Sequence, residues 1–409
     1  MSFSPLSKKS LFSLSVVSFA LLSSFNAMTH EASYIDMPSQ LLIKSAIAVQ
    51  NKSIVADDEG WLIPGVMLGG EATPQYSGAA VNDLQLFARL NLDDDYYLGS
   101  KLGFHQHQGE GELELENYWL GKYVRFDNSI LKIDVGQTAT DTTPTANYHA
   151  SQDEFTTKPL LAEVFFGGHH KDTGIKANWY WRDLELGVEA WNGDAWPTTS
   201  TTSTKTGKGN FASFARYHGY IAGIKTDFAV WYSMGEADQR IDSRYDTSHS
   251  HSSSTITVPD GSFTGDVAMA GSYLLLSHQV TESFLWEAQG EWIHSELDGD
   301  IADTTQSAVL QQSLDGYRFM FGVHLQKHKF FVQQEMLVIN NKFTDATTTF
   351  IEQQGLYNAG FEPQRLILGY HWQWRPNFTL RVESVSDQTQ SDEAQEYWSV
   401  GLMWQHKLL

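Results

Sequence analysis

Two histidines and three carboxylates of this sequence are spaced so that they could share a bound cation. His105 and His107 alternate along one predicted strand, and Glu112, Glu114 and Glu116 alternate along the next. Residues two apart on a strand point to the same face, and only a short link joins the two strands. Zinc accepts imidazole nitrogen and carboxylate oxygen, so this pattern predicts a divalent-cation site. The plainer interpretation is a hydrated acidic wall without a dedicated site.

A second set of ionisable residues lies in the long polar link over residues 138–172. If this link folds into a pore, its charges narrow the passage and set its selectivity; the alternative is a loop that lies over the mouth. The apolar run Leu160–Phe166 favours inward folding, because that run needs a surface to pack on. The side chains of the link expected at the constriction are His149, Asp153, Glu154 and Lys158.

His169 and His170 end the same link and give a second metal-binding hypothesis, because imidazole nitrogen binds zinc. Adjacent residues of a strand point to opposite faces. The alternative is therefore a pair of exposed histidines that share no ligand.

Basic and acidic side chains fall in one phase of many predicted strands, opposite the apolar phase. Opposed basic and acidic walls would produce a transverse field that orients charged solutes, whereas cross-strand salt bridges would give the same residues a structural role. Three of the cations, Arg89, Arg365 and Arg381, are expected at the constriction. The other basic residues in this phase are Lys176, Arg182, Arg216, Lys225 and Arg318, and the acids are Glu185, Glu189, Asp227, Glu287, Glu291 and Glu383.

Motifs that carry enzymatic chemistry are absent from the sequence: it has no G-x-S-x-G, no phosphate-binding loop and no H-E-x-x-H. Ser, His and Asp are abundant, but no spacing singles out a catalytic triad, so we expect neither an enzyme nor a cofactor. The absence of cysteine excludes disulfides and thiol catalysis. A formal net charge of −22 argues against nucleic-acid binding, which needs a basic surface.

The elements that must position these residues are β-strands, and residues 317–339 show their pattern best. From Tyr317 to Leu325 the odd-numbered positions are apolar or aromatic. From Phe330 to Val338 most of the even-numbered positions are apolar or aromatic. Alternation with period two puts each set on one side of a sheet. Runs of about ten residues can cross a bilayer as tilted strands, and one apolar face with one polar face is typical of a barrel wall between lipid and water.

The sequence predicts an all-β fold, a transmembrane antiparallel barrel of 16 strands with its long third outer loop folded into the lumen. Even-numbered links are short and odd-numbered links are long apart from 108–111, as expected where short periplasmic turns alternate with long outer loops. The long links include 138–172, 193–208, 234–264, 296–312 and 340–363. The predicted strands are 61–72, 83–92, 96–107, 112–122, 129–137, 173–182, 184–192, 209–218, 220–233, 265–276, 283–295, 313–326, 329–339, 364–374, 376–386 and 396–407.

The N-terminus has the features of a cleaved secretory signal peptide over residues 1–27. Lys8 and Lys9 form a basic region, an apolar serine-rich stretch follows, and Ala27 is the expected cleavage point. Cleavage there removes two lysines and no acids, which takes the formal net charge to −24.

The mature chain is expected to have two parts. Residues 28–60 are polar and irregular and are predicted to form an N-terminal periplasmic segment, in which 39–50 could be a short helix or the lead-in to a strand. Residues 61–409 are predicted to form the barrel. No later stretch reaches 18 consecutive apolar residues, so no transmembrane helix is expected.

This pattern resembles the 16-stranded porins of Gram-negative bacteria over about residues 61–409. The long third outer loop, which follows Leu131–Gln137, is similar to the loop that porins fold into the lumen. Asn192-Gly193-Asp194 after Trp191 resembles the phosphate-selective porin O/P branch, and some barrels of this general kind are associated with zinc acquisition. The resemblance implies an outer-membrane location, contact with the lipid bilayer and lipopolysaccharide, and a small hydrophilic solute or a metal ion as cargo. Homotrimers are common among such porins.

The sequence therefore predicts a porin-type channel for passive uptake of small hydrophilic solutes, with a preference for cations and with zinc or another divalent metal as a candidate solute. A phosphate-specific pore should show rungs rich in lysine, whereas this chain has isolated cations among more numerous acids. The alternatives are an anion-selective, phosphate-type porin and, from another class, a structural barrel or an outer-membrane enzyme.

Overall fold

The computed structural model describes residues 37–52, 62–69, 72, 77–107, 110–199, 207–242 and 259–409, except for the side chains of 105–107, 110 and 112. The predicted signal peptide lies outside the described residues. None of the helices in this described part has the length and apolar character that a membrane-crossing helix needs.

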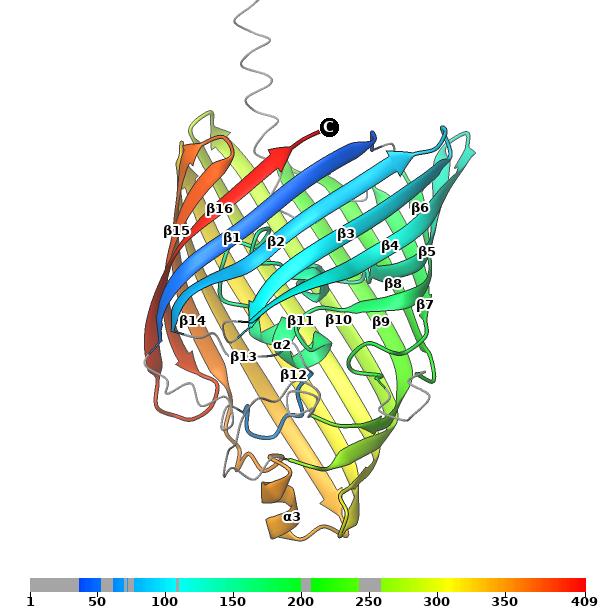
Figure 1. Ribbon diagram of the computed structural model, residues 1–409, viewed down its shortest axis with the longest axis vertical. Coiled ribbons are helices and arrows are strands. Elements are labelled where there is room, and N and C mark those ends of the chain that lie inside the picture. Colours follow the sequence, from blue (N-terminus) through cyan, green and yellow to red (C-terminus); the bar gives the residue numbers. More distant parts are fainter. Residues whose placement is uncertain are drawn as a thin grey trace, which may run out of the picture.

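The described residues form sixteen antiparallel strands that close into one barrel, which confirms the predicted fold class (Figure 1). Each strand pairs with its chain neighbours, and β16 pairs with β1. The strands are β1 Gln40–Lys52, β2 Gly78–Asn91, β3 Tyr96–His107, β4 Glu110–Phe126, β5 Ser129–Ala139, β6 Lys171–Trp181, β7 Leu184–Trp191, β8 Asn210–Ile221, β9 Ile224–Arg240, β10 Ser262–Thr281, β11 Phe284–Ala302, β12 Ser307–Leu325, β13 His328–Thr344, β14 Gln364–Arg375, β15 Phe378–Gln388 and β16 Gln395–Lys407.

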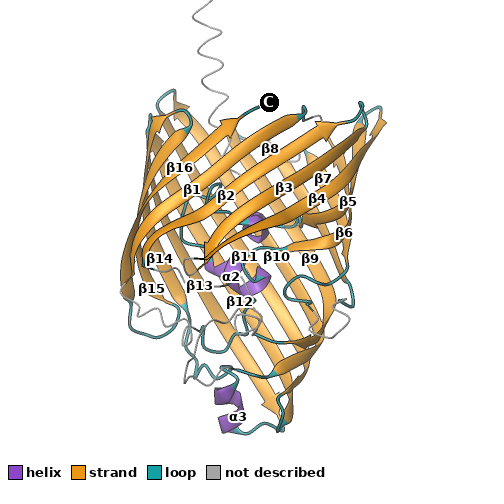
Figure 2. Cartoon of the chain, in the orientation of Figure 1, coloured by secondary structure: helices purple, strands orange, loops and turns teal. Residues whose placement is uncertain are grey.

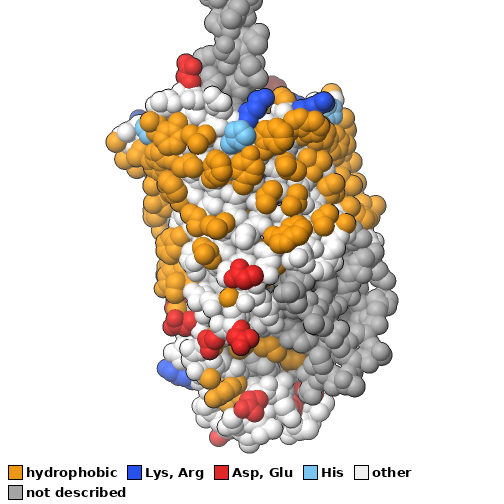
Figure 3. Space-filling view, turned by 90° about the vertical axis from the view of Figure 1, so that its left-hand side faces the viewer, with side chains coloured by type: hydrophobic (Ala, Val, Ile, Leu, Met, Phe, Trp, Pro, Cys, Tyr) orange, Lys and Arg blue, Asp and Glu red, His pale blue; other side chains and the backbone are white. Residues whose placement is uncertain are grey.

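Alternation along the strands gives the barrel an apolar outer surface. On β12, Phe319 is 55% exposed and Phe321 is 48% exposed, whereas Arg318, which faces the lumen, is 2% exposed. Apolar side chains cover the wall toward the end that carries the C-terminus, and acidic side chains lie on the visible surface nearer the opposite end (Figure 3). This distribution is the one expected of a wall with lipid around its middle.

The two ends of the barrel differ in their links. Tight turns such as 127–128 and 182–183 lie at the end with the C-terminus, and the long links, among them 140–170, lie at the other (Figure 1). The predicted alternation is confirmed, but the predicted long link 296–312 is wrong. β11 and β12 continue until only 303–306 joins them, because the inward side chains of their extensions are buried in a local core.

The first strand of the barrel is β1, so the prediction that residues 61–72 form it is wrong. β1 lies within the segment 28–60 that we expected to be periplasmic and outside the barrel. Residues 62–69 form no strand: the chain turns at Pro64 and Gly65, where Gly65 has φ +90°, and the side chain of Leu68 is completely buried. Their apolar pattern comes from burial inside the barrel and not from a lipid-facing wall.

A β-bulge in β4 changes the direction of Trp119. The register with β3 shifts beside Glu116, so the residues after it face opposite to the expected side. Period-two alternation along the predicted strand 112–122 places Trp119 on the outer face together with Leu113. It lies inside the wall instead, where its ring covers Gly99 and packs against Phe87.

The inside of the barrel holds a short helix and an apolar core. Helix α2, Leu160–Phe166, lies near the middle of the barrel and has all seven residues buried (Figure 2). It contacts β11, β12 and β13 and is preceded by the 3₁₀-helix η2, Pro144–Asn147. A second helix, α3, Thr348–Gln353, lies at the long-link end (Figure 1).

Candidate functional site: the lumen and the loop that crosses it

Residues 140–170 form the lumen loop, which crosses the barrel interior as predicted for the third long link. It contacts the wall on strands that are five apart around the barrel. The backbone N–H of Asp141 donates to Glu189 of β7 at 2.7 Å, and the backbone N–H of Ser151 donates to Asp83 of β2 at 3.1 Å. The loop is therefore held across the lumen and not over its mouth.

Carboxylates on several strands of the wall accept hydrogen bonds from the lumen loop. Glu335 accepts from the backbone N–H of Leu160 at 2.9 Å, and Glu383 accepts from the backbone N–H of Thr157 at 3.1 Å. Glu291 accepts from the hydroxyls of Thr143 and Thr145. Wall acids thus satisfy loop donors that would otherwise be buried without partners.

Arginines of the wall bind the acceptors of the same loop. Arg365 donates to Glu163 at 3.3 Å and to the carbonyl of Lys158 at 2.9 Å, and on the wall it also donates to Asp387 at 3.3 Å. Arg381 donates to the carbonyls of Ala150 at 2.8 Å and Asp153 at 3.1 Å. Two of the three arginines expected at the constriction therefore anchor the loop.

The third arginine, Arg89, lies apart from the loop near the short-turn end. Its guanidinium donates to the Tyr123 hydroxyl at 2.9 Å and lies 3.7 Å from the centre of the Tyr97 ring. Cation–π contact with two tyrosines fixes this charge on the inner wall.

The loop residues predicted at the constriction are inside the barrel, but they are engaged by neighbours. His149 lies 2.7 Å from Lys101 through Nε2, and the side chain of Asp153 lies 3.6 Å from Arg318. Lys158 is only partly buried and its carbonyl accepts from Arg365. The predicted residues therefore share one lumen, but they contact protein groups there and do not form a row of hydrated charges.

Glu154 lies deep in the packed part of the loop. Its carbonyl accepts from Nε2 of His371 at 2.7 Å, and its carboxylate lies 3.4 Å from Nδ1 of the same ring. Burial raises the pKa of Glu154 to about 8, with Lys329 opposing the rise and Glu287 adding to it. This raised pKa favours the neutral form of Glu154.

Apolar packing fills part of the lumen around α2. Leu161, Val164 and Phe165 of α2 pack against inward-facing apolar side chains of the wall, among them Trp231 and Ile293. Ile63 and Leu68 of the first long link belong to the same core. Glu335, Glu383, Arg381 and His371 are 0% exposed, although all four face the lumen.

The residues predicted to bind metal do not meet in the described part of the chain, where no group of three or more His, Asp or Glu side chains has the arrangement of a metal site. Glu114 forms an ion pair with Lys171, and Glu116 lies 3.0 Å from Lys101. The side chains of His105 and His107 lie outside the described residues. In the hypothesised site, the ammonium of Lys101 already neutralises Glu116.

His169 and His170 point apart, as their adjacency suggested. The His169 ring lies 5.4 Å from that of His149, and the His170 ring lies 5.5 Å from that of Trp191. Burial lowers the pKa of His170 to about 4, with His169 adding to the shift. The pair shares no ligand position.

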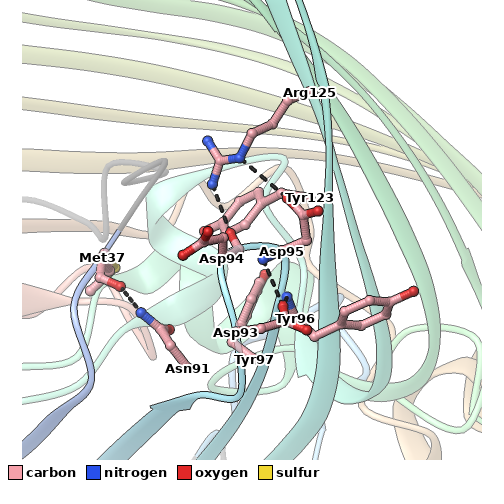
Figure 4. Close-up of a pocket in the computed structure, with 9 residues that line it drawn as sticks. All are labelled: Met37, Asn91, Asp93, Asp94, Asp95, Tyr96, Tyr97, Tyr123 and Arg125. Carbon is pink, nitrogen blue, oxygen red and sulfur yellow. Dashed lines mark hydrogen bonds and ion pairs between the residues drawn. The ribbon is translucent and has the colours of Figure 1, made fainter.

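A cavity of about 490 Å³ opens at the short-turn end (Figure 4). Asp94 and Asp95 of the turn between β2 and β3 lie beside Arg125, which donates to the Asp94 carbonyl at 2.9 Å and to the Asp95 carboxylate at 3.3 Å. Tyr97 and Tyr123 line the cavity from the inner wall. Acids and one arginine lie at the rim of this cavity.

Sequence reasoning missed Trp196, Gly69 and Gly167, which meet at the C-terminal end of α2. A Cβ on Gly69 would lie 2.5 Å from the Cα of Gly167 and 3.1 Å from the Trp196 ring. The available signal was the pair of double glycines in the sequence, Gly69-Gly70 and Gly167-Gly168, since glycine permits close backbone approach.

Together, the closed wall, the apolar exterior and the inward loop define a 16-stranded antiparallel barrel fold that solved outer-membrane barrels share. Neither a protein-family model nor a curated protein sequence matches this chain. Among solved structures, OprB of Pseudomonas putida, determined at high pH, has a TM-score of 0.52 at 12% identity and covers 100% of both chains.

Two further solved structures show the same fold. The outer-membrane channel DcaP of Acinetobacter baumannii has a TM-score of 0.50 at 12% identity, over 93% of this chain and 100% of that one. The trimer form of OmpT of Vibrio cholerae, an outer-membrane protein, has a TM-score of 0.51 at 10% identity, over 90% and 99%. At such identities the likeness shows the fold alone.

Proposed function

We propose that this protein is an outer-membrane channel for passive passage of small hydrophilic solutes. The observation that carries the proposal is the closed 16-stranded wall, apolar outside and lined inside by ionisable side chains. Closure satisfies every ladder hydrogen bond within the sheet, which is what a bilayer-spanning wall requires. The solved barrels with this fold include a named outer-membrane channel.

The cellular setting follows from this proposal. The short-turn end faces the periplasm and the long links face outward, in contact with lipid and lipopolysaccharide. Residues 1–27 direct export and are removed. A homotrimer is the assembly that we propose, since one solved barrel of this fold is a trimer form.

A preference for cations is supported by charge, because the chain carries 49 Asp and Glu against 27 Lys and Arg. The turn between β2 and β3 adds Asp93, Asp94 and Asp95, which line the cavity at the short-turn end. Zinc or another divalent metal remains our candidate solute through His105 and His107, which lie on β3 near the long-link end. The phosphate-type alternative requires anion preference and lysine-rich rungs.

The test is the reversal potential of purified protein in a planar bilayer under a KCl gradient, followed by micromolar zinc. We expect a cation-selective current that zinc blocks, and we expect the block to be lost in His105→Ala/His107→Ala. His278→Ala/His328→Ala, at the short-turn end, is the matched control and should keep the block.

Three other results would change the proposal. Cation selectivity without zinc sensitivity leaves a general porin. Anion selectivity overturns the charge argument in favour of the phosphate-type pore. An absence of current from wild type and from every variant described below favours a structural barrel or an enzyme.

A further inference from the structure

Three segments far apart in the sequence meet at one point inside the barrel. They are residues 62–69 of the first long link, the C-terminal end of α2 in the lumen loop, and residues 195–198 after β7. All three are buried there. The packing of each segment therefore depends on the other two.

Backbone contact between two glycines makes the first junction. A Cβ built on Gly69 would lie 2.5 Å from the Cα of Gly167, and one built on Gly167 would lie 3.0 Å from the Cα of Gly69. Gly167 also has φ +62° as the residue that ends α2. No side chain fits between these segments without separating them.

Trp196 covers both glycines and joins them to the wall. Its ring lies 3.1 Å from a Cβ built on either glycine, and its indole N–H donates to the carbonyl of Val164 in α2 at 3.2 Å. The guanidinium of Arg240, at the end of β9, lies 4.4 Å from the ring centre. Arg240 also donates to the carbonyl of Pro197 at 2.8 Å.

We propose that Gly69, Gly167, Trp196 and Arg240 form a latch that holds the lumen loop in a closed position, and that solute passes only when the latch releases. The proposal rests on the channel function proposed above and names its regulation. The latch belongs to links at the long-link end of the barrel. Packing at one glycine contact is an all-or-none arrangement, since the two backbones either touch or part.

The first experiment compares open probability in single-channel recordings of wild type, Trp196→Ala and Gly69→Leu. We expect wild type to be mostly closed and both variants to open about tenfold more often or more, because losing a buried aromatic contact exceeds the free energy of a tenfold population shift. Trp398→Ala and Gly290→Leu are the controls. Trp398 is 45% exposed on the outer face, and a Cβ on Gly290 meets only Phe319, at 3.7 Å.

A reversible crosslink tests closure directly, since the chain has no native cysteine. A Cβ on Gly316 of β12 would lie 3.3 Å from Cγ of Leu161, which suits a disulfide between Leu161→Cys and Gly316→Cys. The Phe165 ring must shift to admit it. In the Trp196→Ala background, oxidation should abolish the openings and reduction should restore them.

The outcomes separate the latch from the channel. Wild-type open probability in Trp196→Ala and Gly69→Leu, together with current when the lumen loop is deleted, overturns the latch and leaves the channel standing. Steady wild-type current that the crosslink does not stop has the same meaning. If the loop deletion also carries no current, both proposals fail.

Discussion

We expect Glu154 to make the position of the lumen loop depend on pH. Burial raises the pKa of this carboxyl from 4.5 to about 8, so between these values the docked loop keeps a proton that the same group releases in water. The docked state therefore loses stability as pH rises through this window. Above the window Glu154 is ionised in both states, so the free energy of docking no longer changes with pH. The ionisable groups around Glu154 are Lys329, Arg381, His371, Glu287 and Asp153.

We therefore expect channel openings to be rare at pH 5 and to become about tenfold more frequent or more by pH 8. Glu154→Gln, which stays neutral, should remove this dependence and keep the low-pH behaviour throughout. Single-channel recording with the same pH on both sides measures it. An unchanged pH dependence in Glu154→Gln would assign the effect to another of the surrounding groups.

Phe321 tests the facing of the wall. It is 48% exposed on the outer surface of β12, so an arginine there should cost about 2–4 kcal/mol if the position lies at the bilayer midplane. We expect Phe321→Arg to hinder assembly, seen as loss of the heat-modifiable band on a gel. Gln311→Arg, on the same face nearer the long-link end, should assemble normally. Normal assembly of Phe321→Arg would contradict the assigned facing.

Single residues also show where sequence reasoning stops. The facing of Arg318, Phe319 and Phe321 was predictable, because alternation needs only neighbours in the chain. Trp119 was assigned the wrong face, because one extra residue at Glu116 reverses the phase and no local signal marks it. Arg381 was placed in the lumen correctly, but its partners are loop carbonyls more than two hundred residues away, which alternation cannot supply.

At the scale of elements, β1 was missed because its two faces differ little. Its inward positions include Ala46 and Ala48, and its outward positions include Ile47 and Val49, so the apolar–polar contrast that marks other strands is weak. Residues 62–69 gave the opposite error, because burial in the lumen makes a loop as apolar as a strand. Pro64 with Gly65 was the signal against a strand there.

The pairing of β3 with β4 depends on glycines that accept aromatic rings. A Cβ on Gly99 would lie 2.1 Å from the Trp119 ring, so Gly99→Val must displace that ring or bend the strand. We expect a loss of about 1–3 kcal/mol in the free energy of unfolding, measured by urea titration in detergent. Gly290→Val, where a side chain points outward, is the control and should change little. Equal urea midpoints for Gly99→Val and Gly290→Val would show that the Trp119 ring moves aside without a loss of stability.

For the whole molecule, the barrel wall and the lumen loop inside it are stabilised by different interactions. The wall is held by ladder hydrogen bonds between neighbouring strands and by lipid around its apolar exterior. The lumen loop is held by the apolar core around α2 and by the wall acids and arginines that bind it. Inward-facing apolar residues such as Trp231 and Ile293 are stabilised by packing against the loop. Alternation along the strands does not reveal this packing, so the sequence predicted a polar lumen.

This separation predicts that the barrel survives without its lumen loop. β5 and β6 are paired up to Ala139 and Lys171, so a short Gly-Ser turn can replace 141–169 without stretching the wall. We expect the deletion variant to keep heat-modifiable mobility and resistance to protease, because no ladder bond is removed, and to carry a larger conductance. Water would then solvate Glu335, Glu383 and Arg381, which the loop now covers. Loss of the folded barrel in this variant would mean that the core around α2, and not the closed sheet, holds the wall together.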